Sequence, residues 1–178
     1  METTAFRTDG GATWLNLLAT RGQSFGAHPV ERLPDTASVA AWLDLVGLPP
    51  DVPPTEAEHA TLVSLREALR ELAMAAVEGR PASPDARRLV GEHASAPLPH
   101  VAAGADRVPV AESLAAIAAQ ALVTLAGPDR HLLKECAEGD CRWVFLDPSG
   151  RRRWCPNPAC ATRGRVRAHR ARATAAEA

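Results

Sequence analysis

Lysine is nearly absent from this chain: Lys134 is the only one among 20 basic residues, and tyrosine is missing altogether. The position of an arginine therefore carries more information than the arginine count. No segment approaches the roughly 18 uninterrupted apolar residues of a membrane-spanning helix. Residues 1–11 lack the basic and apolar regions of a secretory signal, so we expect a cytoplasmic protein in a reducing compartment. A phosphate-binding glycine loop and an HExxH motif are also absent.

Cysteine is absent from residues 1–135, and all four cysteines follow in the pattern C-x4-C-x13-C-x4-C. Two short cysteine pairs joined by a hairpin-length segment suit a tetrahedral zinc ion, which prefers soft sulfur ligands. A disulfide is the alternative, but a reducing compartment disfavours it. We therefore predict one structural zinc, bound as thiolates by Cys136, Cys141, Cys155 and Cys160.

The sign of the net charge changes at the same place in the chain. Residues 1–135 hold 11 basic and 17 acidic side chains, a net charge of −6, whereas residues 136–178 hold nine arginines and four acids, a net charge of +5. A basic run directly after a zinc site is typical of nucleic-acid-binding fingers. A solvated helix end that only keeps the domain in solution is the alternative. The candidate nucleic-acid contacts are Arg151, Arg152, Arg153, Arg163, Arg165, Arg167 and Arg170.

The first 127 residues are predicted to be mainly helical. Residues 97–110 break the helical period, and we predict a small β-hairpin there. His59, Glu67 and Glu71 are expected on solvated helix faces. Helices are predicted from Trp14 to Thr20, from a cap at Asp35 or Thr36 to Gly47, from the Thr55–Glu58 capping box to Gly79, from Ser83-Pro84 through Val90, and from Leu114 to Leu125.

The cysteine-rich segment is predicted to form a β-hairpin followed by a basic helix. Arg142–Asp147 is the first strand, Asp147–Gly150 the turn and Arg151–Trp154 the returning strand. Asn157 is the expected N-cap of the helix, and residues 131–135 are an expected helical lead-in. The fold class is thus α+β: a helical domain, 1–127, and a finger, 131–174, with separate cores.

These residues resemble the bacterial CGNR zinc-finger family with an N-terminal ABATE domain. Upstream, Glu31-Arg32-Leu33 and Ala41-Trp42-Leu43 are similar to the ABATE pattern. Ala161 and Thr162 stand where the family has Gly and Asn, which removes an amide that could cap the helix or contact a base. The finger motif is carried by Cys136, Cys141, Trp143, Phe145, Asp147, Ser149, Arg152, Arg153, Trp154, Cys155, Cys160 and Arg163.

The resemblance implies a stress-induced transcription regulator whose finger binds DNA and whose N-terminal domain senses a small-molecule or protein ligand. Because one finger makes few contacts, we expect a homodimer. The alternative function is a protein-interaction adaptor with a structural zinc module. Gly22 to Gly26 spells the GxSxG string of serine hydrolases, but no strand-to-helix elbow is predicted around it, so we expect a loop and no enzyme.

Overall fold

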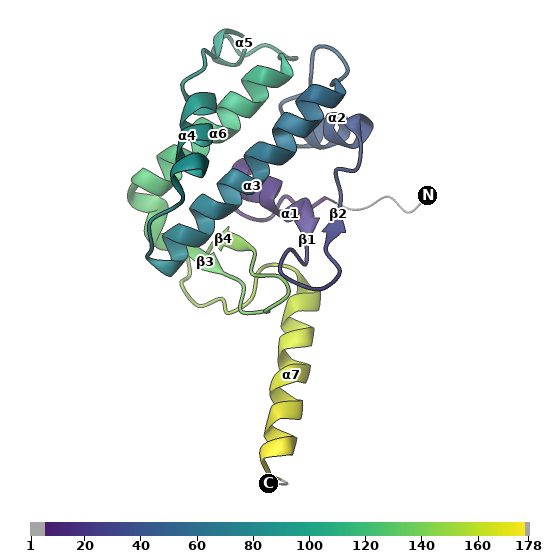
Figure 1. The fold of residues 1–178 in the computed structure, drawn as a ribbon, viewed down its shortest axis with the longest axis vertical. Helices are drawn as coiled ribbons and strands as arrows, with labels where there is room; N and C mark the ends of the chain where they lie inside the picture. The colour runs from purple at the N-terminus through teal and green to yellow at the C-terminus, as the bar shows by residue number, and fades with distance from the viewer. Residues whose placement is uncertain (1–5, 177–178) are drawn as a thin grey trace.

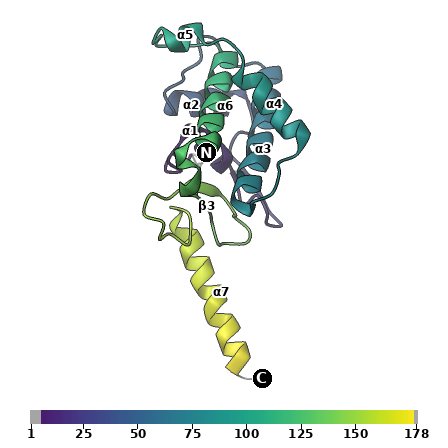
Figure 2. The same ribbon diagram turned by 90° about the vertical axis from the view of Figure 1, so that its left-hand side faces the viewer.

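The computed structural model describes residues 6–176, so the first five residues of the predicted domain 1–127 lie outside it. Packed helices form a body (Figure 1), and one long C-terminal helix projects away from it (Figure 2). No described helix is both long and apolar enough to cross a membrane. In chain order the helices are α1 (Thr13–Ala19), α2 (Thr36–Leu45), α3 (Glu56–Glu78), α4 (Pro84–Ala94), α5 (Pro99–Ala102), α6 (Val110–Ala126), the 3-10 helix η1 (Pro128–Leu132) and α7 (Pro158–Ala176).

Local capping signals set the ends of several N-terminal helices. The side chains of Asp35, Thr55 and Ser83 each accept a backbone hydrogen bond at the start of α2, α3 and α4. Gly79 ends α3 in the left-handed region at φ 67°, a conformation that glycine adopts without strain. The mainly helical prediction for the N-terminal part is confirmed.

Two antiparallel strand pairs lie where the body meets the cysteine-rich segment. β1 (Arg21–Gly22) pairs with β2 (Val30–Glu31), and β3 (Leu133–Glu135) pairs with β4 (Val144–Leu146). The GxSxG string runs through the β1–β2 connection, where the hydroxyl of Ser24 donates to the carbonyl of Arg21. The serine therefore lies in a loop, as predicted, and not on a strand-to-helix elbow.

The hairpin predicted for residues 97–110 is wrong. The chain there forms α5, and Val108 makes a single bridge to Pro50 instead of a local strand pair. A carboxylate from the next helix explains the difference: Glu112 accepts the backbone N–H groups of His100 and Val101 at 2.9 and 3.2 Å. This tertiary contact satisfies the free N–H groups at the start of α5, which no local pattern reveals.

The strand pairing predicted for the finger is also wrong in part. β4 forms as predicted, but its partner is β3, with Leu133 opposite Leu146 and Glu135 opposite Val144. The expected helical lead-in at 131–135 is therefore mostly strand. Burial explains the choice, since β3 and β4 place apolar side chains in the core whereas Arg151–Arg153 is an exposed loop.

The two predicted domains share one buried cluster of apolar side chains instead of the two separate cores that we expected. The indole N–H of Trp143 donates to the carbonyl of Leu15 in α1 at 2.8 Å, and Leu146 N–H donates to Gly10 at 2.9 Å. A Cβ atom at Gly10 would lie 2.7 Å from the Trp143 ring, so glycine permits this close approach. The finger is thereby fixed to the helical body.

Glu67, predicted to lie on a solvated face, instead joins a partly buried ion network. Arg66 is 1% exposed and binds both carboxylate oxygens of Glu31 at 2.7 Å, while Glu67 contacts Arg66 and Arg70. Burial alone would raise the pKa of Glu31, but the hydrogen bonds from Arg66 and from backbone N–H groups outweigh it and lower that pKa. The network joins β2 to α3 beside the finger.

The solvation prediction for His59 is also wrong, whereas Glu71 keeps contact with solvent. The side chain of His59 is 17% exposed, and its Nε2 lies 2.9 Å from the carbonyl of Leu33. Glu71 forms an ion pair with Arg80 at 2.7 Å. Leu33 is 26 residues from His59 in the chain, and Arg80 lies beyond the end of α3. The periodicity of apolar residues within a helix gives no information on such partners.

Candidate metal centre and nucleic-acid interface

Three of the four cysteines lie in loops or turns, and the fourth lies in a helix. Cys136 follows β3, and its N–H donates to the carbonyl of Trp143 at 2.9 Å, which extends the β3–β4 ladder to the metal site. Cys141 closes a tight turn in which its N–H and that of Arg142 both donate to Glu138 O. Cys160 lies in the first turn of α7. Asn157, the predicted N-cap, accepts the N–H of Ala159 at 3.1 Å.

The sulfur atoms have the separation of a tetrahedral zinc site. All four lie within 4.8 Å of one another, and the Sγ atoms of Cys141 and Cys155 are 4.0 Å apart. Zinc–sulfur bonds of about 2.3 Å in a tetrahedron place sulfurs about 3.8 Å apart. A disulfide needs about 2.05 Å, and all four cysteines are free. The four cysteines therefore form the site of one structural zinc, as predicted.

The thiols in this cluster depend on one another for their protonation. Hydrogen bonds from the Cys141, Cys155 and Cys160 thiols lower the pKa of Cys136 far below its usual range. Donating to Cys136 raises the pKa of Cys155 and of Cys141 far above it. The four sulfur atoms are thus close enough to share protons. A divalent cation would replace these protons and ionise all four ligands.

A buried carboxylate inside the first cysteine loop binds the basic helix. Glu138 is 1% exposed, and its Oε1 lies 2.6 Å from Nη1 of Arg167 and 3.8 Å from Nε of Arg163. Arg167 also donates to Asp140 at 2.7 Å. Two of the predicted nucleic-acid contacts thus have acidic partners inside the finger, and a phosphate would have to compete with them.

This carboxylate role was missed in the sequence, although a signal was present. Arg163 and Arg167 are four residues apart and so lie on one helix face, and Glu138 and Asp140 alternate within the first cysteine loop. Such a pattern indicates ion pairs between the two halves of a finger once the cysteines are brought together by the metal.

Trp154 joins the arginine loop to α7. The guanidinium groups of Arg153 and Arg165 lie 5.3 and 5.7 Å from the centre of its ring. A Cβ atom at Gly164 would lie 2.4 Å from the indole nitrogen, so a glycine inside the helix lets the ring pack against it. The loop and the helix thereby present their arginines on a continuous surface.

The remaining predicted contacts are exposed. Arg151 and Arg152 lie in the loop after the Asp147–Gly150 turn, and Asp147 holds that loop by accepting Arg152 N–H at 2.7 Å. Arg170 lies farther along α7, where the helix stands clear of the body (Figure 2). Of the seven predicted arginines, only Arg163 is half-buried, and Arg163 and Arg167 have Glu138 as a partner inside the finger.

Two family models match the chain in the order that the resemblance implied. Residues 11–128 match ABATE, described as "Putative stress-induced transcription regulator", and residues 132–173 match the CGNR zinc finger. Neither describes an enzyme. No curated protein and no solved structure matches the chain. The resemblance drawn from the finger motif and the upstream patterns is confirmed.

Proposed function

Because this chain belongs to the ABATE family and carries a CGNR zinc finger, we propose that it is a zinc-dependent, DNA-binding transcription regulator. The single observation that carries the proposal is α7, a projecting helix with five arginines and no acidic residue between Pro158 and Ala176. The major groove of DNA admits one α-helix, and phosphates flank it on both sides.

The exposed arginines would supply the phosphate contacts. Arg165 on the helix and Arg153 on the loop both lie against Trp154, so both can reach the backbone when α7 enters a groove. Arg151 and Arg152 extend the same loop. Arg170 lies farther out on α7 and belongs to the proposed contact set. Phosphate contacts of this kind position a protein on DNA without choosing a sequence.

Arg163 and Arg167 have a different part in the proposal. Their ion pairs with Glu138 and Asp140 orient the first turns of α7 relative to the zinc site. A contact of either side chain with DNA requires that this pairing open or be shared. We propose that these two arginines fix the helix in the free protein and add to phosphate binding only when DNA is present.

The remaining parts of the proposal concern the helical body. It would bind a ligand and control the finger, in a cytoplasmic protein that pairs as a homodimer to double its DNA footprint. The direct contacts of Trp143 and Leu146 with the first residues of the body give a physical route between the two parts.

The adaptor function remains the second candidate, and one observation favours it. Glu138 and Asp140 neutralise two of the nine arginines in residues 136–178, which lowers the positive charge available for DNA. Fluorescence anisotropy of a labelled random-sequence duplex with zinc-loaded protein separates the two functions. Binding that weakens with salt supports the regulator; no binding by micromolar protein at about 50 mM salt supports the adaptor.

A further inference from the structure

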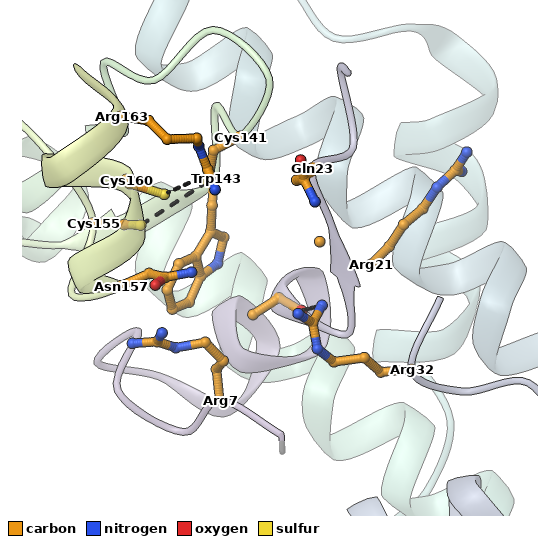
Figure 3. A pocket seen from close by; sticks show the side chains of 12 residues that line it. Arg7, Arg21, Gln23, Arg32, Cys141, Trp143, Cys155, Asn157, Cys160 and Arg163 are labelled. Atoms are coloured by element: carbon orange, nitrogen blue, oxygen red, sulfur yellow. Dashed lines mark hydrogen bonds between the residues drawn. The ribbon is translucent and has the colours of Figure 1, made fainter. Parts of the chain in front are cut away.

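A cavity of about 220 Å³ lies beside the metal centre, between the helical body and the finger. Figure 3 shows Arg32 and Gln23 on the side of the body, and Arg163 beside the cysteines on the side of the finger. Arg7 and Arg21 complete a set of four arginines in the wall, while Asp and Glu are absent from it. A wall with four guanidinium groups and no carboxylate is suited to an anion.

Arg32 carries the strongest indication. It is half-buried, and its guanidinium donates only to the carbonyl of Ala19, at 3.3 Å; within residues 6–176 it has no ion pair. The adjacent carboxylate, Glu31, is already bound on both oxygens by Arg66. Burial lowers the pKa of Arg32, and the nearby charge of Arg7 lowers it further. The charges of Glu31 and Cys141 act in the opposite direction, and a guanidinium keeps its proton, so Arg32 remains a half-buried cation.

The backbone beside Arg32 provides room for it. A Cβ atom at Gly22 would lie 2.4 Å from one terminal nitrogen of Arg32 and 3.0 Å from the other. Glycine at this position in β1 therefore allows the guanidinium to lie flat against the strand. The fold thus holds Arg32 at the cavity by a specific local arrangement.

The other three arginines are held more loosely or at the rim. Arg21 lies 3.6 Å from Glu67, Arg163 lies 3.8 Å from Glu138, and Arg7 forms an ion pair with the exposed Asp9. Arg21 and Arg163 can turn toward a bound anion at little cost, because long ion pairs near water contribute little. Arg7 binds both carboxylate oxygens of Asp9 and would have to share that partner with the anion.

Cys141, Cys155 and Cys160 line the same cavity and bring the charge of the metal site to it. Four thiolates on a divalent zinc leave about −2, against four guanidinium groups in the wall. The Trp143 indole adds an apolar surface to the same cavity. We propose that the cavity binds a small molecule with a phosphate or carboxylate dianion, which Arg32 and Arg7 recognise through their guanidinium groups. The proposal names a ligand class for the regulator proposed above.

Such a ligand would connect the two parts of the protein. Arg7, Arg21 and Arg32 belong to the helical body, whereas Arg163 belongs to α7. An anion in the cavity would compete with Glu138 for Arg163 while Glu138 keeps its shorter contact with Arg167. Ligand binding would thus change how the base of α7 is held, and with it the affinity for DNA.

The test uses the zinc-loaded full chain without DNA, so that it stands apart from the DNA-binding proposal. Isothermal titration with inorganic phosphate and with succinate, at constant ionic strength set by sodium chloride, is expected to show one site per chain for at least one of them. The tighter probe identifies the phosphate or the carboxylate class. Arg32→Gln should weaken binding at least about tenfold, because it removes one charge-assisted contact of about 1.5–3 kcal/mol. Arg87→Gln, at an exposed position of α4, should leave it unchanged.

A second variant tests the position of the Arg32 guanidinium without changing the charge of the cavity. Gly22→Ala keeps all four arginines but displaces the Arg32 guanidinium, so it should also weaken binding. If Arg32→Gln does not retain zinc, the anion affinity of Gly22→Ala decides whether Arg32 contacts the anion. Absence of binding for both probes, or equal affinities for the wild type and both variants, would overturn the proposal. Loss of DNA binding with intact anion binding would instead contradict only the regulator function.

Discussion

Oε1 of Glu138 lies 2.6 Å from Nη1 of Arg167, and this contact joins the first cysteine loop to the helix that follows the second pair. Zinc joins the same two segments through the four sulfurs. The base of α7 is therefore fixed twice, by the metal and by an ion pair with the buried Glu138. The body adds a third attachment through Trp143 and Leu15. The helix that we propose to contact DNA is thus coupled to the whole chain.

The metal site leads to a stoichiometric prediction. Freshly purified protein should hold one zinc per chain, with four sulfurs at about 2.3 Å by X-ray absorption. Cys136→Ser should abolish zinc binding and unfold the finger, because structural zinc contributes about 10–16 kcal/mol in finger peptides. Metal analysis and circular dichroism measure both effects. A Cys136–Cys141 disulfide under reducing conditions, or protein that folds fully without metal, would contradict the assignment.

The shared core predicts that the two parts of the chain unfold together. Trp143→Ala removes a buried ring and the hydrogen bond to Leu15, and should lower the free energy of unfolding by about 3–5 kcal/mol. Calorimetry should show one transition at a lower temperature. Phe25→Ala, at an exposed ring in the β1–β2 connection, is the control and should shift the melting temperature much less. Two well-separated transitions would show that the finger and the helical body are independent.

Features set by residues close together in the chain could be predicted from the sequence, whereas features set by tertiary contacts could not. The cysteine spacing identified the metal site, and caps such as Thr55 with Glu58 placed helix starts correctly because the groups that bond are three residues apart. The strand partner of β4 could not be identified, since β3 is chosen by burial against α1 and α3. The hairpin expected at 97–110 failed because Glu112, in another helix, stabilises α5.

The candidate site also combines features that the sequence predicts with features that depend on tertiary contacts. The seven arginines could be identified as basic residues near zinc, but which of them are paired depends on Glu138 and Asp140, brought near only after the metal closes the finger. The arginine cavity could not be predicted from the sequence for a similar reason. Arg7, Arg32 and Arg163 are far apart in the chain, and no local pattern indicates that they converge.

The buried network around Arg66 predicts a specific dependence on pH. The pKa of Glu31 is lowered from 4.5 in the folded protein, so its interaction stabilises the fold above that value and is lost as pH falls through the lowered pKa. Glu31→Gln should be less stable than the wild type at pH 7. The difference in free energy of unfolding should shrink as pH falls from about 4.5 through the lowered pKa, at which the folded wild-type carboxylate becomes protonated. Urea unfolding at several pH values measures it, and a constant difference would contradict the role of Glu31.

Removing the charge of Glu138 should release the base of α7. Glu138→Gln leaves Arg163 and Arg167 with weaker partners, so the finger should be less stable and its free positive charge greater. The variant should bind DNA more tightly at low salt, with a slope of log K against log salt steeper by about 0.9–1.8. Glu92→Gln, at an exposed position on α4, is the control. Unchanged slope and affinity would mean that these two arginines do not contact phosphate even when freed.

The exposed arginines predict the salt dependence of the wild type. If Arg165, Arg170 and the three arginines of the 151–153 loop each neutralise one phosphate, five contacts give a slope of about −4.5. Arg165→Gln should flatten this slope by about 0.9 and weaken binding about equally on all duplexes, because phosphate contacts carry no sequence information.

Arg163→Gln should behave differently if this side chain reaches a base edge: its loss should cost about 1–3 kcal/mol on a preferred sequence and little elsewhere. Anisotropy titrations on a selected duplex and on a scrambled one separate these outcomes. A slope near zero with zinc bound would favour the adaptor function, because an interface without phosphate contacts releases no counterions.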